Sequence, residues 1–251
     1  MAKPVLRAVF LDIDDTLYAS TQFAQAARRS GLQAMLDLGL KGDLEVLYQE
    51  LLEVVAEFSS NDGHHYDKLL LRLPSESFAG INPALLVASA VVAYHRTKAD
   101  GLRVFDGVYP CLRYLRRYGV LIGIISSGRT IKQAEKLVRL GVLPYLHPEG
   151  VFISEQIGID KPNPKIFEKV LKRFRLSPGE VMYIGDHPQK DILPAHRLGI
   201  CTVWMLQGSR YRGQRGVPAM YILENYTQLL EVFQQDFELC SYDGFLRSDD
   251  D

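Results

Sequence analysis

Cysteine is scarce in this sequence, and long apolar runs are absent. The three cysteines, Cys111, Cys201 and Cys240, stand far apart without CxxC spacing, so neither a disulfide framework nor a zinc cluster is expected. The longest apolar stretch, roughly residues 83–94, is much shorter than the ~20 residues that a membrane-spanning helix needs. The N-terminus also lacks the charged and then apolar pattern of a secretory signal. We therefore expect a cytoplasmic protein with no membrane partner.

Neither sign of charge is in excess. The 29 lysines and arginines nearly balance the 30 aspartates and glutamates, which leaves a formal net charge of -1. A nucleic-acid-binding surface normally shows a basic excess, so we expect no nucleic-acid partner. Any anionic ligand must be held by a local site. An apolar content of 47% in 251 residues is sufficient for a packed core.

Short apolar runs alternate with helical patterns along most of the chain. The runs are apolar nearly throughout, which is typical of strands that a parallel sheet buries on both faces. Helices between such strands predict βαβ units with right-handed crossovers. The predicted strands are 6–12, 120–126, 151–154, 181–186 and 202–206, and the predicted helices are 108–118, 130–140, 165–174 and 192–198. The expected fold is α/β, a doubly wound parallel sheet.

Residues 20–103 break this alternation, because they contain helix signals and hardly any strand signal. One helix is expected over 20–38, and a second begins after Asp43 as its N-cap. A third begins at Asn82 and Pro83, a capping residue followed by proline at the first helical position, and is expected to end near residue 96. The predicted domains are a core of residues 1–19 and 104–251 and an inserted helical cap of residues 20–103.

Polar residues follow the predicted strands of the core. Asp12 and Asp14 come directly after the first strand, at the carboxyl edge where open α/β sheets bind ligands. Further polar positions occur at later strand ends or in the loops after them: Ser126, Lys161, Asp186 and Asp191. A solvated turn or a helix cap explains each of them separately. Their joint occurrence in this order indicates one site.

These positions resemble the motifs of the haloacid dehalogenase superfamily, over nearly the whole chain from residue 6 to residue 206. Asp12 and Asp14 match the DxDxT motif, and Ser126 matches the serine or threonine that follows a hydrophobic strand. Lys161 matches the lysine motif, and Asp186 with Asp191 matches GDxxxxD. Capped members carry a helical insertion after the first motif. The resemblance implies a phosphatase with a Rossmann-like core, acting on a small phosphorylated metabolite such as a sugar phosphate, nucleotide or triose phosphate.

The same resemblance implies a role for each motif residue. Asp12 would form an aspartyl-phosphate, and Asp14 would act as acid and base. Lys161 and Ser126 would bind the phosphoryl oxygens. Mg²⁺ would be held by the carboxylates of Asp12 and Asp186 and the backbone carbonyl of Asp14, with Asp191 acting through water or another ligand.

Cations are needed because the approach of a carboxylate to a dianionic phosphate ester is opposed by about 4 kcal/mol per charge pair at 4 Å and an effective dielectric constant of 20. To act as an acid, Asp14 must carry a proton. We therefore expect apolar surroundings or neighbouring carboxylates to raise its pKa.

Other functions remain open on this scaffold. A haloacid dehalogenase would attack carbon and need neither a metal nor an acid at Asp14, and a phosphomutase would pass the phosphoryl group to a sugar hydroxyl. A phosphonatase would use a cap lysine such as Lys68 or Lys98. Outside the enzymes, a receiver-like signalling module or a non-catalytic phosphate-binding protein would use similar residues. The adjacent His64 and His65 are interpreted as a turn or helix start, because neighbours on a helix face different directions.

Overall fold

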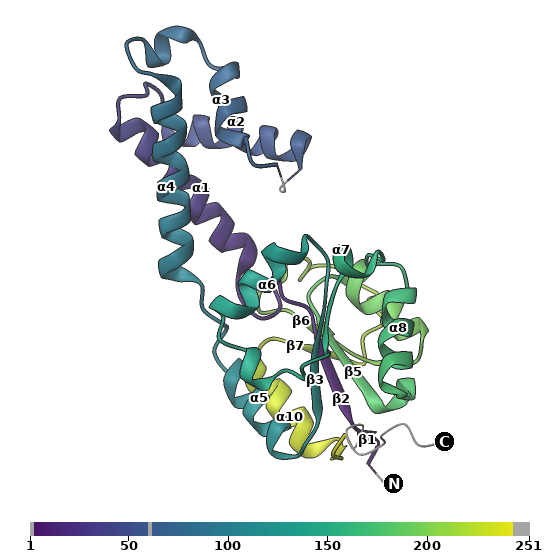
Figure 1. Ribbon diagram of the computed structural model, residues 1–251. Coiled ribbons are helices and arrows are strands. Elements are labelled where there is room, and N and C mark those ends of the chain that lie inside the picture. The colour runs from purple at the N-terminus through teal and green to yellow at the C-terminus, as the bar shows by residue number, and fades with distance from the viewer. Residues whose placement is uncertain (1–2, 60–61, 243–251) are drawn as a thin grey trace. The chain divides into compact units, whose positions relative to one another are not determined.

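A computed structural model describes residues 3–59 and 62–242. It divides into two compact units, drawn in Figure 1. One consists of Met1–Ser20 with Arg103–Asp251, and the other of Thr21–Leu102.

The first unit is built on a six-stranded sheet in which every neighbouring pair of strands is parallel. In spatial order the strands are β4 (Val151–Ile153), β3 (Leu121–Ser126), β2 (Ala8–Leu11), β5 (Val181–Gly185), β6 (Cys201–Met205) and β7 (Tyr221–Leu223). The chain builds outward from β2 to β4 and then returns to place β5 on the other side of β2. This order confirms the predicted doubly wound α/β fold, and its topological switch point lies between β2 and β5.

Helices cover both faces of this sheet, with α8 on one side and α5 and α10 on the other (Figure 1). The helical segments are α5 (Val108–Arg117), α6 (Thr130–Arg139), η2 (Leu143–Tyr145), α7 (Ser154–Ile157), α8 (Lys165–Phe174), η3 (Pro178–Glu180), η4 (Pro188–Ile192), α9 (Leu193–Arg197) and α10 (Tyr226–Gln235). On the α8 face, Phe167 and Phe174 are buried against Phe10 and Tyr183. Phe10 requires the glycine opposite it in β3, because a Cβ on Gly123 would lie 2.3 Å from its ring.

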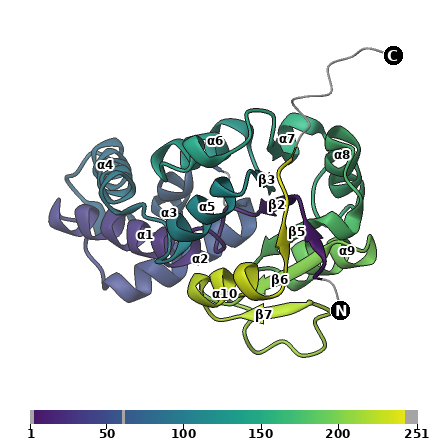
Figure 2. The ribbon, with the colours of Figure 1, turned by 90° about the horizontal axis from the view of Figure 1, so that it is seen from below.

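The structure confirms the predicted strands and core helices and adds elements that the sequence pattern did not predict. The run from residue 6 is divided: β1 (Val5–Leu6) pairs with β8 (Glu238–Leu239) in a separate two-stranded sheet, and β2 begins at Ala8. Strand β7 was not predicted because it is three residues long and only its last residue is buried. Figure 2 shows β7 and α10 together at one edge of the sheet.

The second unit is helical. It contains most of α1 (Ser20–Asp37), then α2 (Leu44–Phe58), α3 (His65–Arg72), η1 (Ser75–Phe78) and α4 (Pro83–Gly101) around a core that includes Leu32, Met35, Leu51, Leu69 and Leu86. The Asp43 carboxylate accepts hydrogen bonds from the N–H groups of Glu45 and Val46, which confirms it as the N-cap of α2. Asn82 caps α4 as predicted, although that helix extends to Gly101. Helix α3 begins at His65, which confirms the predicted turn or helix start at His64 and His65. Within the described residues, no helix has the length and apolar character needed to cross a membrane.

Candidate active site

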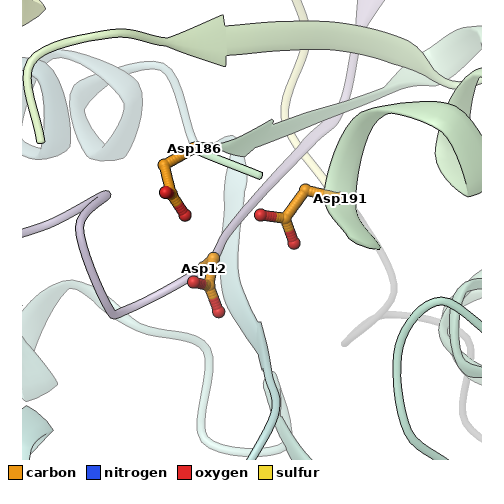
Figure 3. A group of neighbouring side chains, drawn as sticks. All are labelled: Asp12, Asp186 and Asp191. Carbon is orange, nitrogen blue, oxygen red and sulfur yellow. The ribbon is translucent and has the colours of Figure 1, made fainter. Parts of the chain in front are cut away.

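Three carboxylates gather at the switch point of the sheet. Asp12 follows β2 and Asp186 follows the neighbouring strand β5, and the Asp12 N–H donates to the Ile184 carbonyl at 2.9 Å. Asp191 comes from η4, a single π-helical turn after β5. One carboxylate oxygen of each residue lies within 4.8 Å of the others (Figure 3).

The end of β6 and the loop after it fix the backbone around these carboxylates. The indole N–H of Trp204 and the hydroxyl of Ser209 both donate to the Asp186 carbonyl at 2.8 Å. The same loop approaches Asp15 closely, because a Cβ on Gly208 would lie 2.3 Å from the Asp15 carbonyl oxygen. Asp15 itself has φ 52, a left-handed conformation that aspartate tolerates better than most residues.

Lys161 connects two of the carboxylates. Its ammonium donates to Asp12 Oδ1 at 2.8 Å and to Asp191 Oδ1 at 2.6 Å, and it lies 3.1 Å from the Tyr183 hydroxyl. Burial alone would lower the pKa of Lys161, but the charges of Asp12 and Asp191 outweigh that effect and hold the pKa well above its ordinary value. Lys161 is therefore a cation, and this one positive charge is bonded to two of the three carboxylates.

The excess of negative charge appears in the pKa values of the aspartates. Burial raises the pKa of Asp186 to about 9, and the charges of Asp191, Asp12 and Asp15 add to the increase. Burial also raises the pKa of Asp12 to about 6, although Lys161 opposes it. The hydrogen bonds that Asp186 accepts from Trp204 and Ser209 go to its backbone carbonyl. Within the described residues, its carboxylate has no hydrogen bond or ion pair. Clustered carboxylate oxygens with too little counter-charge fit a hard divalent cation.

Asp191 has protein donors at both of its carboxylate oxygens. Oδ1 lies 2.6 Å from the Lys161 ammonium and 3.0 Å from the Tyr183 hydroxyl, and Oδ2 accepts the His187 N–H at 3.0 Å. Asp191 approaches the end of β5 so closely that a Cβ added to Gly185 would lie 2.5 Å from the Cβ of Asp191. These contacts favour Asp191 as the residue that orients Lys161 rather than as a direct metal ligand.

Ser126 ends β3 and Asp14 follows the neighbouring strand β2, and both contact the same side chain on α6. The side-chain nitrogen of Gln133 donates to Ser126 Oγ at 3.0 Å and to Asp14 Oδ2 at 3.1 Å. The Lys136 ammonium is 2.7 Å from both oxygens of Asp14, and the Tyr18 hydroxyl donates to Oδ1 at 2.9 Å.

This arrangement contradicts the raised pKa expected for Asp14. Burial does favour the neutral acid, but the charge of Lys136 and the hydrogen bonds from Lys136, Gln133 and Tyr18 together lower the pKa of Asp14 below its ordinary value. The expectation was wrong because Lys136 lies 122 positions away in the sequence and no local pattern connects the two residues.

The site also contains residues that the sequence analysis did not select. Gln133 and Lys136 are three positions apart on the helix that follows Ser126, so they share one helix face, and this spacing is a signal that could have been used. The hydroxyl of Tyr183 is 3.0 Å from both Asp191 Oδ1 and the Ile125 carbonyl, which connects the lysine to the strand that ends at Ser126. In sequence Tyr183 looks like any other apolar strand residue, so nothing pointed to this contact.

Comparison with known proteins identifies the family. A model of the haloacid dehalogenase-like hydrolases matches residues 6–199, which include every candidate site residue. The chain belongs to the haloacid dehalogenase-like hydrolase family. Among curated proteins of this kind, the glyceraldehyde 3-phosphate phosphatase of Methanopyrus kandleri is 46% identical over 207 residues, covering 81% of this chain and 85% of that relative. The Pyrococcus furiosus enzyme of the same name is 38% identical over 237 residues, covering 92% and 94%.

Solved structures of haloacid dehalogenase-like proteins share the fold. A phosphatase of this group from Thermococcus onnurineus has a TM-score of 0.58 and 24% identity, covering 90% of this chain and 97% of that one. The hydrolase YfnB of Bacillus subtilis, solved with bound magnesium, has a TM-score of 0.61 and 21% identity, covering 92% and 99%. At these identities the comparison establishes the architecture alone.

Proposed function

We propose that this hydrolase is a Mg²⁺-dependent phosphatase that hydrolyses glyceraldehyde 3-phosphate through an aspartyl-phosphate on Asp12. The phosphatase class follows from relatives of that activity that match 81% and 92% of the chain, and their names support the substrate. The observation that carries the mechanism is the buried Asp12 carboxylate, 2.8 Å from the Lys161 ammonium and beside Asp186 and Asp191. This arrangement combines a nucleophile with a cation, Lys161, and with carboxylates that would hold a metal ion, and the two positive charges would offset the charge of an approaching phosphate.

The carboxylates of Asp12 and Asp186 would hold the metal ion, together with the backbone carbonyl of Asp14. Asp191 would contribute indirectly, because its oxygens already accept hydrogen bonds from Lys161 and the His187 N–H. When bound, Mg²⁺ supplies positive charge that offsets the repulsion between Asp12 and a phosphate dianion. The raised pKa of Asp186 supports this assignment, because it reflects a buried carboxylate among other carboxylates, whose charged form a bound cation would stabilise.

In the first step, a carboxylate oxygen of Asp12 attacks phosphorus, and the bond from phosphorus to the ester oxygen breaks. Asp14, in its protonated form, gives its proton to the departing alkoxide, so that glyceraldehyde leaves as a neutral molecule. Lys161 and the hydroxyl of Ser126 donate hydrogen bonds to the phosphoryl oxygens. The negative charge of a bound phosphate raises the pKa of Asp14 and so opposes the effect of Lys136.

In the second step, the Asp14 carboxylate takes a proton from water as the water oxygen attacks phosphorus. The bond from phosphorus to Asp12 breaks, which restores the Asp12 carboxylate and releases inorganic phosphate. The lowered pKa of Asp14 suits this step, since the residue is then present as the base. A haloacid dehalogenase would have no use for this network of donors around Asp14, which favours phosphoryl transfer.

The direct test is phosphate release from a panel of glyceraldehyde 3-phosphate, sugar phosphates, nucleotides and phosphoglycolate. We expect the highest kcat/KM for glyceraldehyde 3-phosphate, loss of turnover in EDTA, and recovery with Mg²⁺ but little with Ca²⁺ because of its looser coordination. Asp12→Asn should fold and lose several orders of magnitude in kcat, because the amide is nearly isosteric but not nucleophilic. Full activity in EDTA would contradict the metal assignment, and a tenfold higher kcat/KM for another ester would contradict the substrate.

A further inference from the structure

Gln133 contacts two functional groups at once. It is 2% exposed, and its side-chain nitrogen lies 3.0 Å from Ser126 Oγ, 3.1 Å from Asp14 Oδ2 and 2.5 Å from the Ser127 carbonyl. A carboxylate and a backbone carbonyl only accept hydrogen bonds, so the amide must turn its nitrogen toward them. Ser126 Oγ therefore faces N–H groups of Gln133, and its own hydrogen is left for an acceptor elsewhere.

The other end of the same amide argues for a role beyond packing. Gln133 Oε1 is buried and has no hydrogen-bond partner in residues 3–59 and 62–242. An unsatisfied buried acceptor lowers stability, and a leucine at this position would avoid that cost. What glutamine offers and leucine does not is the amide nitrogen, which contacts Asp14 and Ser126.

Lys136 completes the arrangement one helical turn further along α6. Its ammonium is 2.7 Å from each oxygen of Asp14, and its side chain is 19% exposed. The start of α6 is itself held, because the Glu155 carboxylate accepts the Thr130 N–H at 2.7 Å and Ser154 Oγ accepts the Gly128 N–H at 2.9 Å. Gln133 and Lys136 therefore extend from a helix that is fixed to the neighbouring α7 segment.

We propose that Gln133 and Lys136 are positioning residues, with Lys136 holding the acid/base Asp14 and Gln133 aligning both Asp14 and the phosphate-binding Ser126. This inference rests on the proposed phosphatase function and adds residues that none of the motif positions includes. The two residues act through others and do not touch the reacting atoms. Their loss should therefore reduce kcat and leave KM nearly unchanged.

The test compares Lys136→Met, Lys136→Arg and Gln133→Leu in the full-length enzyme with Mg²⁺. Lys136→Met and Gln133→Leu should each lower kcat for glyceraldehyde 3-phosphate by about 10- to 100-fold, the loss expected from a misplaced catalytic group. Lys136→Arg should recover most of the rate, since a guanidinium also binds both oxygens of a carboxylate. Arg139→Met is the matched control, because it removes one positive charge from the same helix at an exposed pair with Glu135, and it should keep the wild-type kcat.

Combination with Asp14→Asn separates positioning from other roles. Lys136→Met should change the rate of the Asp14→Asn enzyme by less than about twofold, because residues that act as a unit are not additive. Gln133→Leu should retain part of its effect in that background through Ser126. An unchanged or higher kcat for Lys136→Met alone would overturn the proposal. So would an equal loss in the Asp14→Asn background, which would mean that Lys136 contacts the substrate.

Two substrates, glyceraldehyde 3-phosphate and p-nitrophenyl phosphate, are needed for a clear outcome. If wild-type enzyme releases no phosphate from glyceraldehyde 3-phosphate, the proposed substrate is wrong, and the variants are judged on steady-state turnover of p-nitrophenyl phosphate, for which Asp14 is still the base. If wild-type enzyme turns over the substrate and the variants keep its kcat, the positioning role is rejected and the proposed function is not. Thermal unfolding of each variant checks the fold. For Gln133→Leu, removal of the unpartnered Oε1 opposes the loss of the hydrogen bonds from the amide nitrogen, so its unfolding temperature should change little.

Discussion

Asp12 and Asp14 are separated by one residue, yet their surroundings prepare them for different chemistry. Asp12 is buried beside Lys161 and other carboxylates, and its pKa is raised to about 6, so it is an anion at neutral pH. Asp14 is surrounded by donors from Lys136, Gln133 and Tyr18, and its pKa is lowered. In the proposed mechanism, Asp12 forms the bond to phosphorus and Asp14 moves the proton.

Asp14→Asn should separate these two roles. Without the acid, an alkyl ester such as glyceraldehyde 3-phosphate should lose about 10²- to 10⁴-fold in rate, the usual contribution of a positioned proton donor. The p-nitrophenolate group leaves with little protonic help, so its burst phase should be affected much less. Dephosphorylation also needs Asp14 as the base, and the aspartyl-phosphate should therefore accumulate. Burst kinetics with acid-quench detection of the phosphoenzyme measure both effects. Equal losses for both esters in the burst, with no phosphoenzyme, would remove Asp14 from proton transfer.

At the scale of an element, the end of β6 and the loop after it hold Asp186 in place. Trp204 and Ser209 bond to the Asp186 carbonyl, and Gly208 lies against the backbone of Asp15. The loop thus joins the segment after β5 to the segment after β2. A small change in this loop should alter the proposed metal site, although none of the carboxylates proposed to bind the metal is touched.

Gly208→Ala tests this dependence. The new Cβ would lie 2.3 Å from the Asp15 carbonyl oxygen, so the loop must shift, at a cost of about 1–3 kcal/mol of stability. We expect weaker Mg²⁺ binding and a lower unfolding temperature. Gly213→Ala is the control in the same loop, since a Cβ there meets nothing within 4 Å, and it should be neutral. Titration calorimetry with Mg²⁺ and thermal unfolding measure the outcome. Equal Mg²⁺ affinity in both variants would show that the loop does not support the site.

At the scale of the whole molecule, the clustered carboxylates link stability to pH. The pKa of Asp186 is about 9 in the folded protein against an ordinary value of 3.8. Between these two pH values Asp186 binds more proton in the folded state than in the unfolded state, so it lowers the free energy of unfolding of the metal-free protein as pH rises. Asp12 acts in the same direction up to about pH 6. The lowered pKa of Asp14 has the opposite sign, but it acts at pH values below 3.8. The lowered pKa values of His147 and His187 also have the opposite sign, but they act near and below the ordinary value of 6.5, whereas Asp186 acts over the whole range from 6 to 8.5.

Metal-free protein should therefore unfold at a lower temperature at pH 8.5 than at pH 6, and Mg²⁺ should restore more stability at pH 8.5. Binding requires the carboxylate form, so affinity increases with pH and protons are released. Differential scanning fluorimetry with EDTA or Mg²⁺ at each pH gives the stabilities, and calorimetry in two buffers counts the protons. Asp186→Asn removes the titrating group and should weaken the pH dependence in EDTA. An unaltered dependence in that variant would assign the effect to other residues.

The sequence by itself determined the parallel α/β architecture and the family of this protein. Both depend on local patterns: continuous apolar runs predict buried strands, and polar residues such as Asp12 and Asp186 at their ends predict a ligand site at the carboxyl edge. The caps Asp43 and Asn82 were predicted for the same reason, since their partners lie two or three positions away.

Only the tertiary structure decided the protonation and partners of the candidate site. Gln133 and Lys136 meet Asp14 across 119 and 122 positions, and the resulting hydrogen bonds reversed the expected direction of its pKa shift. Short strands such as β7, which is held by pairing with β6, were likewise invisible to periodicity. Local spacing predicts which residues share a strand or a helix face, but the charge state of a buried carboxylate depends on donors that distant segments bring to it.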